Sequence, residues 1–530
     1  MRSAISSRGH GRGGRLKLAA AAAVVVTLAL AGCSSSGSTP EASGTPGKGG
    51  TLTVGEQQAP PTLDPGTLDS AYIDFTMVAY DPLFYLAPDG SVEPRLAESW
   101  EYEGEGNTVL DVTLRDGVTF SDGDELTADA VKASLEYARD SEGNHSALLA
   151  DLTFEAVSDL ELKITSAVPN PLIPWLLTQQ YPIGQIISPT GLEDPESLSL
   201  DNTSHGAGAY IYDPDDSVVG DHYTYTANPD YYDKSQQYWD KVVYKITADA
   251  QAALNAAKTG QIDVYKGSPD SAQQAQSAGL QVIANPGIMT GLFLTDRDGE
   301  VVPALADPKV RQAINYAIDR DAITKAILGD MGTPTFQTAI EGADGYSEAF
   351  ADYYTYDPDK AKELLAEAGY PDGFEMKVQA AVFVGFDIVG EAIAAQLAEV
   401  GITMTQDVAT DITVYQANIT GGEFPGFVGG YKAAPMYQQG KDFWLPGSNF
   451  FNPFHTESAE LTDLWNQAAG ASDDERADLD AQMQEYIVEN AWFAPVFWAP
   501  VIYFAAEDIG GVETSAGNPF ASPIAWYPAG

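Results

Sequence analysis

Residues 307–320 read DPKVRQAINYAIDR and carry the clearest helix signal in the chain. Asp307 is a helix N-cap, and Pro308 fits the first helical position because its missing N–H needs no partner there. Apolar residues then recur at helical spacing, at Val310, Ala313, Ile314, Ala317 and Ile318. The pattern predicts a helix whose apolar stripe packs into a core, with Arg311, Asp319 and Arg320 on its polar edges.

The same kinds of signal recur outward from this stretch. Asp357 and Pro358 repeat the helix start, Gly369 supplies a stop, and Ser472 with Glu475 makes a capping box. Alternating apolar and polar residues predict strands at 51–54, 109–114, 160–164 and 242–246. Because strands and helices alternate along the whole length, the fold class is α/β, although pattern alone does not set the strand order.

Composition excludes several classes of protein. The chain has 530 residues, a length that fits about three domains or one large multi-lobed fold. It is 44% hydrophobic, which is enough to form a core. It has 27 basic and 76 acidic residues, a net charge of −49, which argues against binding nucleic acid or an anionic lipid surface. With one Cys it has neither an intrachain disulfide nor a multi-Cys metal site.

The N-terminus has the organisation of an export signal. Residues 1–17 are basic and contain no acid, and an apolar run follows from Leu18 to Leu30, too short to span a bilayer. The run ends in Leu-Ala-Gly-Cys at 30–33, which resembles the bacterial lipobox. We therefore expect a lipoprotein signal peptide at 1–32, lipidation of Cys33 and a flexible Ser/Gly/Pro-rich tether at 33–50. The alternative is an ordinary signal peptide with a chance Cys.

A search for catalytic motifs is negative. The chain has no G-x-S-x-G elbow, no H-E-x-x-H, no P-loop and no C-x-x-C. The four His residues after the signal are far apart and lie in polar contexts, at His145, His205, His222 and His455. Acidic residues are too abundant for a sequence rule to select a glycosidase pair. We therefore expect no catalytic residues, no metal site and no cofactor.

Sequence blocks spread over the chain after the signal point to a family. They include GGTLTV at 49–54, YDPL at 80–83, LAESW at 96–100, LRDGVTFSDG at 114–123, NPDYY at 228–232, GQIDV at 260–264 and VRQAINYAIDR at 310–320. Each block is weak alone, but their joint order is specific. The chain resembles the bacterial extracellular solute-binding proteins of family 5, the dipeptide- and oligopeptide-binding type that serves ABC importers.

The resemblance implies a periplasmic-binding-protein-like, two-lobed fold with an inserted domain and a cleft between the lobes. Lobe 1 would take residues 51–85, 205–295 and 500–530, with an inserted domain at 86–204. Lobe 2 would take residues 296–499. Two strands crossing between the lobes, near Gly291–Thr295 and Pro495–Pro500, would act as the hinge on which the cleft closes.

The resemblance also implies a function without chemistry. We expect an exported, lipid-anchored receptor on the outer face of the cytoplasmic membrane, monomeric, that delivers a peptide or related small solute to an ABC permease of the inner membrane. The same role for an oligosaccharide or another non-peptide solute is the alternative. A secreted hydrolase, and a surface receptor that signals or chaperones without transport, are weaker hypotheses from other classes.

The resemblance further suggests where a ligand binds. One wall of the cleft would come from the segment with Tyr80, Asp81 and Phe84, and the other from a lobe 2 segment with an aromatic followed by an Asp that holds a peptide's amine. Here Tyr431 stands at the aromatic, but Ala434 stands where the Asp is expected, and no Arg lies between Arg320 and Arg476. Free-amine peptide recognition is therefore in question.

Aromatic residues crowd the same region, and two readings of them stay open: core packing, or a wall that stacks on sugars and apolar groups. Asp442 is a candidate to replace the missing acid. The ligand-binding candidates in this lobe are Phe427, Tyr431, Lys432, Asp442 and Trp444.

Overall fold

The computed structural model describes residues 47–382, 385–445, 447 and 450–529. The expected signal peptide, Cys33 and most of the expected tether lie outside these residues. The folded body begins before Thr51, because Gly47 N–H donates to the Pro528 carbonyl at 2.7 Å and Gly49 N–H donates to the Tyr238 carbonyl at 2.8 Å.

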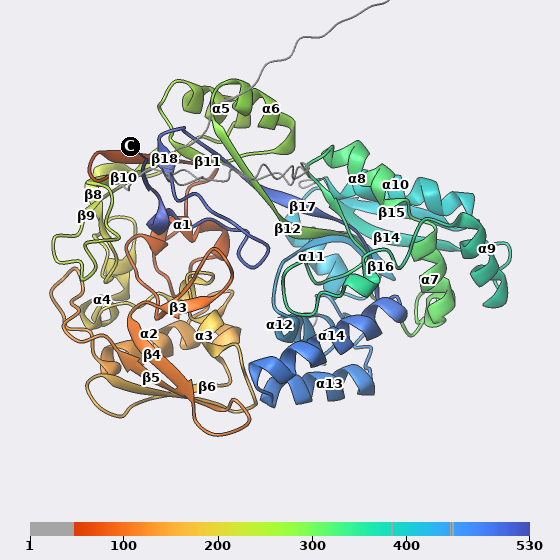
Figure 1. Cartoon of the computed structure of the whole chain (residues 1–530), viewed down its shortest axis with the longest axis horizontal. Helices are drawn as coiled ribbons and strands as arrows, with labels where there is room; N and C mark the ends of the chain where they lie inside the picture. The colour runs from red at the N-terminus through yellow and green to blue at the C-terminus, as the bar shows by residue number, and fades with distance from the viewer. Residues whose placement is uncertain (1–46, 383–384, 446, 448–449, 530) are drawn as a thin grey trace, which may run out of the picture. The chain divides into compact units, whose positions relative to one another are not determined.

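One long mixed sheet, eleven-stranded within the described residues, organises the body (Figure 1). Its order is β15-β14-β16-β12-β17-β11-β1-β10-β9-β8, and β13 pairs with β17. The bounds are β1 (Thr51–Glu56), β8 (Tyr210–Val218), β9 (His222–Ala227), β10 (Lys241–Ile246), β11 (Val264–Lys266), β12 (Gln281–Leu294), β13 (Thr333–Pro334), β14 (Glu375–Ala381), β15 (Thr403–Ala409), β16 (Gly426–Lys432) and β17 (Phe493–Ala505).

Two strands divide this sheet into the parts that we call lobe 1 and lobe 2. β12 and β17 pair antiparallel along almost their whole length. At one end β17 also pairs with β11, which belongs to lobe 1 with β1 and β8–β10. At the other end β12 pairs with β16, which belongs to lobe 2 with β14 and β15. The segments expected to cross between the lobes lie in these two strands.

Lobe 1 carries further small sheets. β4 (Ala97–Tyr102), β5 (Val109–Leu114), β6 (Leu152–Ala156) and β7 (Glu161–Ser166) form an antiparallel sheet of their own, within the expected insert. β2 (Phe84–Leu86) pairs with β3 (Val92–Pro94), and β18 (Ile509–Gly510) pairs with β19 (Tyr527–Pro528). The helices of this lobe are α1 (Asp74–Met77), α2 (Ala128–Asp140), α3 (Ile173–Leu176), α4 (Pro189–Glu193), α5 (Ala250–Lys258) and α6 (Pro269–Ser277).

Helices cover lobe 2, and three of them start at the caps read from the sequence. The helices of this lobe are α7 (Pro308–Tyr316), α8 (Arg320–Leu328), α9 (Pro358–Glu367), α10 (Phe386–Glu399), α11 (Ile412–Thr420), α12 (Met436–Phe443), α13 (Ala459–Gly470) and α14 (Asp473–Glu489). Asp307 caps α7, Asp357 caps α9, and the capping box of Ser472 and Glu475 starts α14. α13 and α14 lie side by side (Figure 1).

The expectation for residues 310–320 is wrong in two details. The helix ends at Tyr316, and a second helix starts at Arg320 with Asp319 as its cap. Arg311 and Arg320 are not on polar edges but are buried. Arg320 donates from Nε to the Pro495 carbonyl at 2.7 Å, and burial lowers its pKa to about 9. These guanidinium groups satisfy backbone carbonyls in the core, which no periodicity reveals: Arg320 ties α8 to β17, and Arg311 ties α7 to the carbonyls of Asn490 and Ala491 after α14.

Candidate ligand-binding cleft

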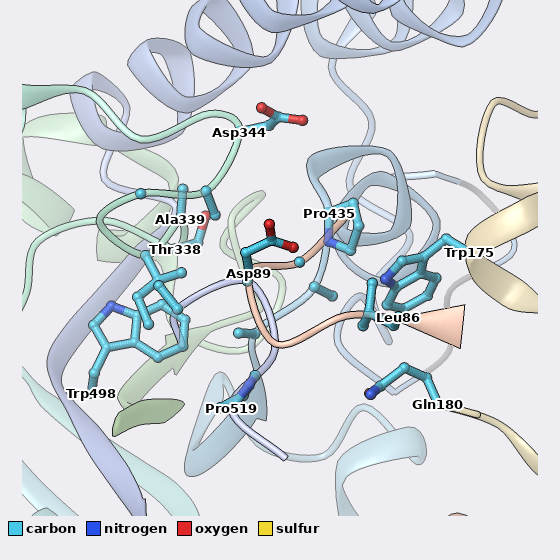
Figure 2. A pocket seen from close by; sticks show the side chains of 18 residues that line it. Leu86, Asp89, Trp175, Gln180, Thr338, Ala339, Asp344, Pro435, Trp498 and Pro519 are labelled. Carbon is cyan, nitrogen blue, oxygen red and sulfur yellow. The ribbon is translucent and has the colours of Figure 1, made fainter. Parts of the chain in front are cut away.

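A cavity of about 250 Å³ lies between the two lobes (Figure 2). Lobe 1 lines it from the turn after β2, from the α3 region and from the loop before β19. Lobe 2 lines it from the loop after β13 and from the segment after β16, and β17 contributes Trp498. The lining residues are Leu86, Asp89, Gly90, Trp175, Gln180, Thr338, Ala339, Ile340, Gly342, Ala343, Asp344, Ala433, Ala434, Pro435, Trp498, Ala516, Gly517 and Pro519.

The charged side chains that line the cavity are all acidic. Asp89 and Asp344 are its charged residues, one from each lobe, and no Lys, Arg or His is among the lining residues. The Asp89 carboxylate accepts from Ser91 Oγ at 2.6 Å and from Ser91 N–H at 3.0 Å, and these hydrogen bonds hold its pKa below the usual range. Asp89 is therefore ionised at neutral pH, and the cleft favours a cationic group.

The segment expected to hold the second wall does border this cavity. Ala433, Ala434 and Pro435 follow β16 and line the lobe 2 side. Ala434, which stands where an Asp was expected from the resemblance, is among the lining residues and brings no charge to the cavity. An amine in this cleft would therefore need a different acid, and the two that the cavity offers are Asp89 and Asp344.

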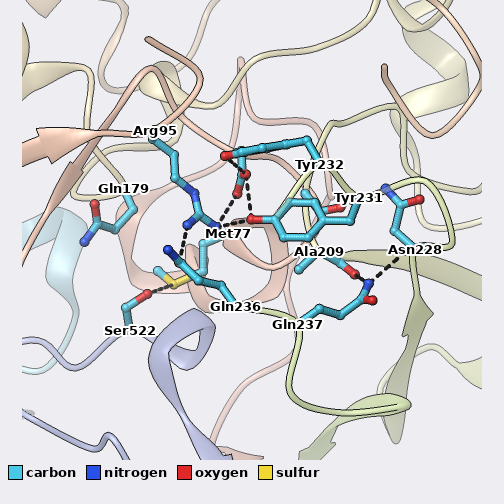
Figure 3. Close-up of polar contacts among 12 residues, drawn as sticks. Met77, Arg95, Gln179, Ala209, Asn228, Tyr231, Tyr232, Gln236, Gln237 and Ser522 are labelled. Atoms are coloured by element: carbon cyan, nitrogen blue, oxygen red, sulfur yellow. Dashed lines mark hydrogen bonds and ion pairs between the residues drawn. The ribbon is translucent and has the colours of Figure 1, made fainter. Parts of the chain in front are cut away.

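The lobe 1 candidates lie elsewhere, in the core. Asp81 is fully buried and accepts from Arg95 Nη2 at 3.0 Å, from Tyr231 Oη at 3.1 Å and from Tyr232 Oη at 2.9 Å. Figure 3 shows Arg95, Tyr231 and Tyr232 converging in this network. The Asp81 carboxylate thus neutralises a buried guanidinium, and it is not among the residues that line the cavity.

Tyr80 and Phe84, which lie close to Asp81 in the sequence, are buried in the core as well. Tyr80 Oη accepts from the His205 N–H at 3.2 Å, and burial raises the pKa of its hydroxyl above the usual range. The Phe84 ring meets the Trp100 ring edge-on with centroids 4.8 Å apart. Both side chains are buried and neither lines the cavity.

Of the two readings of the lobe 2 aromatics, the geometry favours core packing. Phe427 and Trp444 are 1% and 0% exposed. Phe427 stacks on Phe293 of the neighbouring strand at 4.8 Å between centroids and 2° between planes. Tyr431 donates from Oη to Asp442 at 2.7 Å, Gln438 Nε2 donates to the same carboxylate at 3.0 Å, and burial raises the pKa of Asp442. None of these residues lines the cavity.

Lys432 is the remaining candidate, and it faces lobe 1. Its Nζ lies 4.3 Å from the centre of the Tyr181 ring, which comes from the turn after α3. Lys432 itself does not line the cavity, but Ala433 and Gln180, the sequence neighbours of the two partners, do.

Sequence reasoning missed Asp89, Asp344, Trp175 and Trp498. Asp89-Gly90 reads as a turn, and Trp498 lies in a strand that reads as buried, so neither carries a ligand signal. Only the approach of the two lobes brings these residues to one space.

The structure offers no sign of a metal centre or a membrane span in the residues that it describes. Within that part of the chain, no group of three or more His, Cys, Asp and Glu is placed to hold a metal ion. No helix there is long and apolar enough to cross a bilayer.

Two α/β lobes joined by a pair of crossing strands, with a cavity between them, define the class of two-lobed periplasmic binding proteins. The chain belongs to the bacterial extracellular solute-binding proteins, family 5: the family's middle region matches residues 91–449, more than half of the 530 residues. Both the family and the fold class expected from the sequence blocks are confirmed.

Individual relatives are more distant. The glutathione-binding protein GsiB of Salmonella typhimurium is 29% identical over 303 residues, and this match spans only 56% of each chain. The solved structure of AgaA from A. tumefaciens R10, in complex with agropinic acid, is 26% identical with a TM-score of 0.72 and covers 89% of this chain and 98% of that one. DppA of Helicobacter pylori, in complex with the peptide STSA, is 22% identical with a TM-score of 0.73 and covers 91% and 99%.

Proposed function

We propose that this protein is an extracytoplasmic receptor that closes on a small solute and delivers it to an ABC import permease. The observation that carries the proposal is the cavity between the lobes, which is lined from both sides and by Trp498 of β17, one of the two strands that join them. Family membership supports the receptor role and argues against an enzyme. Export with a lipid anchor at Cys33, and a monomeric state, are parts of the proposal that rest on the sequence.

We further propose a solute with a cationic group, such as a peptide amine. Support comes from the lining, in which Asp89 and Asp344 face a cavity without a basic residue. A bound ammonium or guanidinium needs a charged partner when it leaves water. The names of the relatives, which include a glutathione-binding protein and a complex with a peptide, agree with a peptide-like solute. An oligosaccharide is less suited, because a neutral ligand leaves both carboxylates uncompensated when the cleft closes.

The receptor role is tested by thermal unfolding of the purified protein against di- to pentapeptides, glutathione, opines, and gluco- and xylo-oligosaccharides. A ligand present at 100 times its Kd and bound only to the folded state adds about 2.7 kcal/mol and raises the midpoint visibly. A shift with peptides supports the proposal. A shift with sugars alone contradicts the cationic ligand, and turnover of a peptide or glycoside by the pure protein contradicts the receptor role.

The two cleft acids are expected to carry the recognition of an amine. Asp89→Asn and Asp344→Asn should each weaken binding of a free-amine peptide by about tenfold to a hundredfold, since each removes a charge-assisted hydrogen bond. Binding of the N-acetylated peptide should change little. Isothermal titration calorimetry measures both.

Asp359→Asn is the matched control, because Asp359 is an exposed acid of α9 away from the cavity. Equal losses for the free and the acetylated peptide in the cleft variants would show that these acids do not hold the amine.

A further inference from the structure

The lobes also meet at a place that is separate from the strands that join them. On the lobe 1 side, Asn107 lies in the turn between β4 and β5, and its Nδ2 donates to the carbonyls of Ala469 and Ala471 at 2.9 Å each. Ala469 belongs to the last turn of α13 in lobe 2, and Ala471 follows that helix. In Figure 1, β12 and β17 join the lobes in the upper half of the view, and α13 lies in the lower half.

The chemistry of this contact suits a helix end. The last carbonyls of a helix have no partner within the helix, so a side-chain amide from another element can satisfy them. Asn107 has a φ of 50°, in the left-handed region that Asn adopts more readily than most residues. The backbones come close beside it, because a Cβ on Gly470 would lie 3.5 Å from the Cα of Gly106.

A second hydrogen bond crosses between the lobes from the opposite direction. Tyr437 of α12 donates from Oη to the carbonyl of Pro169 at 2.7 Å. Pro169 lies in the loop after β7, on the lobe 1 side. The Tyr437 side chain is 1% exposed, and a buried hydroxyl needs a hydrogen-bond partner. Lobe 1 supplies that partner to a lobe 2 residue.

The two contacts are tied together within each lobe. In lobe 1, the Asn170 N–H donates to the Asn107 carbonyl at 2.9 Å, which joins the loop that carries Pro169 to the turn that carries Asn107. In lobe 2, the Tyr437 ring stacks on the Trp465 ring of α13 at 4.6 Å between centroids and 20° between planes. Trp465 Nε1 also donates to the Tyr437 carbonyl at 2.9 Å. An opening motion of the lobes therefore breaks both interlobe contacts together.

We propose that Asn107 and Tyr437, with the carbonyls that accept from them, form an interlobe latch that sets the fraction of closed protein. The inference rests on the closing receptor proposed above and adds the element that holds the lobes together. Asn107, Pro169 and Tyr437 are not among the residues that line the cavity. The latch thus acts on the equilibrium between open and closed protein and leaves the choice of ligand to the cavity. Water replaces its hydrogen bonds on opening, so it biases closure reversibly.

The first test measures the lobes without a ligand. Cys33→Ser removes the one native Cys, and spin labels are placed on Ala133→Cys of α2 and Ala477→Cys of α14, which are exposed positions on the two lobes. Double electron–electron resonance then gives the distribution of interlobe distances. We expect a closed population of about a tenth, the upper end of the usual range for a minor conformation. Asn107→Gly, which tolerates the left-handed turn, and Tyr437→Phe should each lower it about threefold to tenfold.

Two variants within lobe 2 are matched controls. Asn490 Nδ2 donates to the Tyr486 carbonyl at 2.9 Å, so Asn490→Ala removes a similar amide contact with a helix end. Tyr354 Oη donates to the Val488 carbonyl at 2.6 Å, so Tyr354→Phe removes a similar buried hydroxyl. Neither hydrogen bond crosses between the lobes, and both variants should leave the closed fraction unchanged.

A ligand gives an independent readout. With trialanine as the probe, Asn107→Gly should raise the dissociation rate about threefold to tenfold and leave the association rate nearly unchanged, because the latch forms after the ligand has entered. Stopped-flow fluorescence measures both rates. Trialanine and N-acetyl-trialanine should be affected by the same factor, whereas Asp89→Asn should weaken the free-amine peptide selectively.

The outcomes separate the latch from the receptor proposal. A ligand-free parent protein without a closed population would overturn the latch, and so would a closed fraction that Asn107→Gly and Tyr437→Phe leave unchanged. A purely structural role would lower the midpoint of urea unfolding and keep the distances of the parent. If trialanine does not bind, the peptide form of the receptor proposal fails, and the distances in the ligand-free protein still decide the latch.

Discussion

Replacing Asp81 by alanine is expected to lower the free energy of unfolding by about 3–5 kcal/mol, since it leaves a buried guanidinium without its counter-charge. Arg95 is 4% exposed, and its Nη2 donates to Asp81 at 3.0 Å. Tyr231 and Tyr232 donate to the second carboxylate oxygen, so the variant also removes the acceptor of one buried and one half-buried hydroxyl. Urea unfolding, followed by tryptophan fluorescence, measures this loss in the free energy of unfolding.

A double variant separates the charge from the packing. Asp81→Ala with Arg95→Met should recover part of the stability, because removing both members of a buried pair is milder than removing one. Asp89→Ala is the control, since the carboxylate of this exposed acid accepts hydrogen bonds from Ser91 in its own turn, and its loss should change stability by less than about 1 kcal/mol. A stable Asp81→Ala protein that has lost its ligand would instead place Asp81 in the binding site.

Local signals predicted the starts of elements well. Asp307, Asp357 and the pair Ser472 and Glu475 act within one helical turn, so their effect is written in adjacent residues. The burial of Arg320 and its hydrogen bonds to distant carbonyls could not be predicted from adjacent residues. Its partners include the carbonyl of Pro495, which lies far away in the sequence and comes near only when β17 packs on α8.

The candidate site shows the same contrast between what adjacent residues reveal and what only the folded structure brings together. The segment at Ala434 was found because a family pattern marks it, and it does line the cavity. Asp89 and Asp344 were not found, because an acid in a turn is the commonest kind of acid and only the meeting of two lobes distinguishes these two. The aromatic residues could not be decided from sequence for a related reason: Phe427 and Trp444 have the composition of a stacking wall and the burial of a core, so both interpretations stayed open.

Phe427→Ala is therefore expected to destabilise lobe 2 by about 3–5 kcal/mol, the usual result of removing a buried aromatic ring. The ring stacks on Phe293 at 4.8 Å and meets Phe450 at 5.5 Å and Phe451 at 5.9 Å between centroids, so truncation opens a void among three other rings. The midpoint of urea unfolding measures the loss, and ligand affinity of the folded fraction should stay close to that of the parent.

Phe424→Ala is the matched control, because Phe424 lies just before the same strand but is half-buried and packs beneath the Lys377 ammonium at 5.6 Å. Its loss should be clearly smaller, since less surface returns to water and less of a void is left. The decisive comparison is between stability and binding. A Phe427→Ala protein that unfolds like the parent and fails to bind would restore the stacking-wall reading, whereas a weakened protein that still binds shows that these rings hold β12 and β16 together while the cavity beside Ala434 does the recognition.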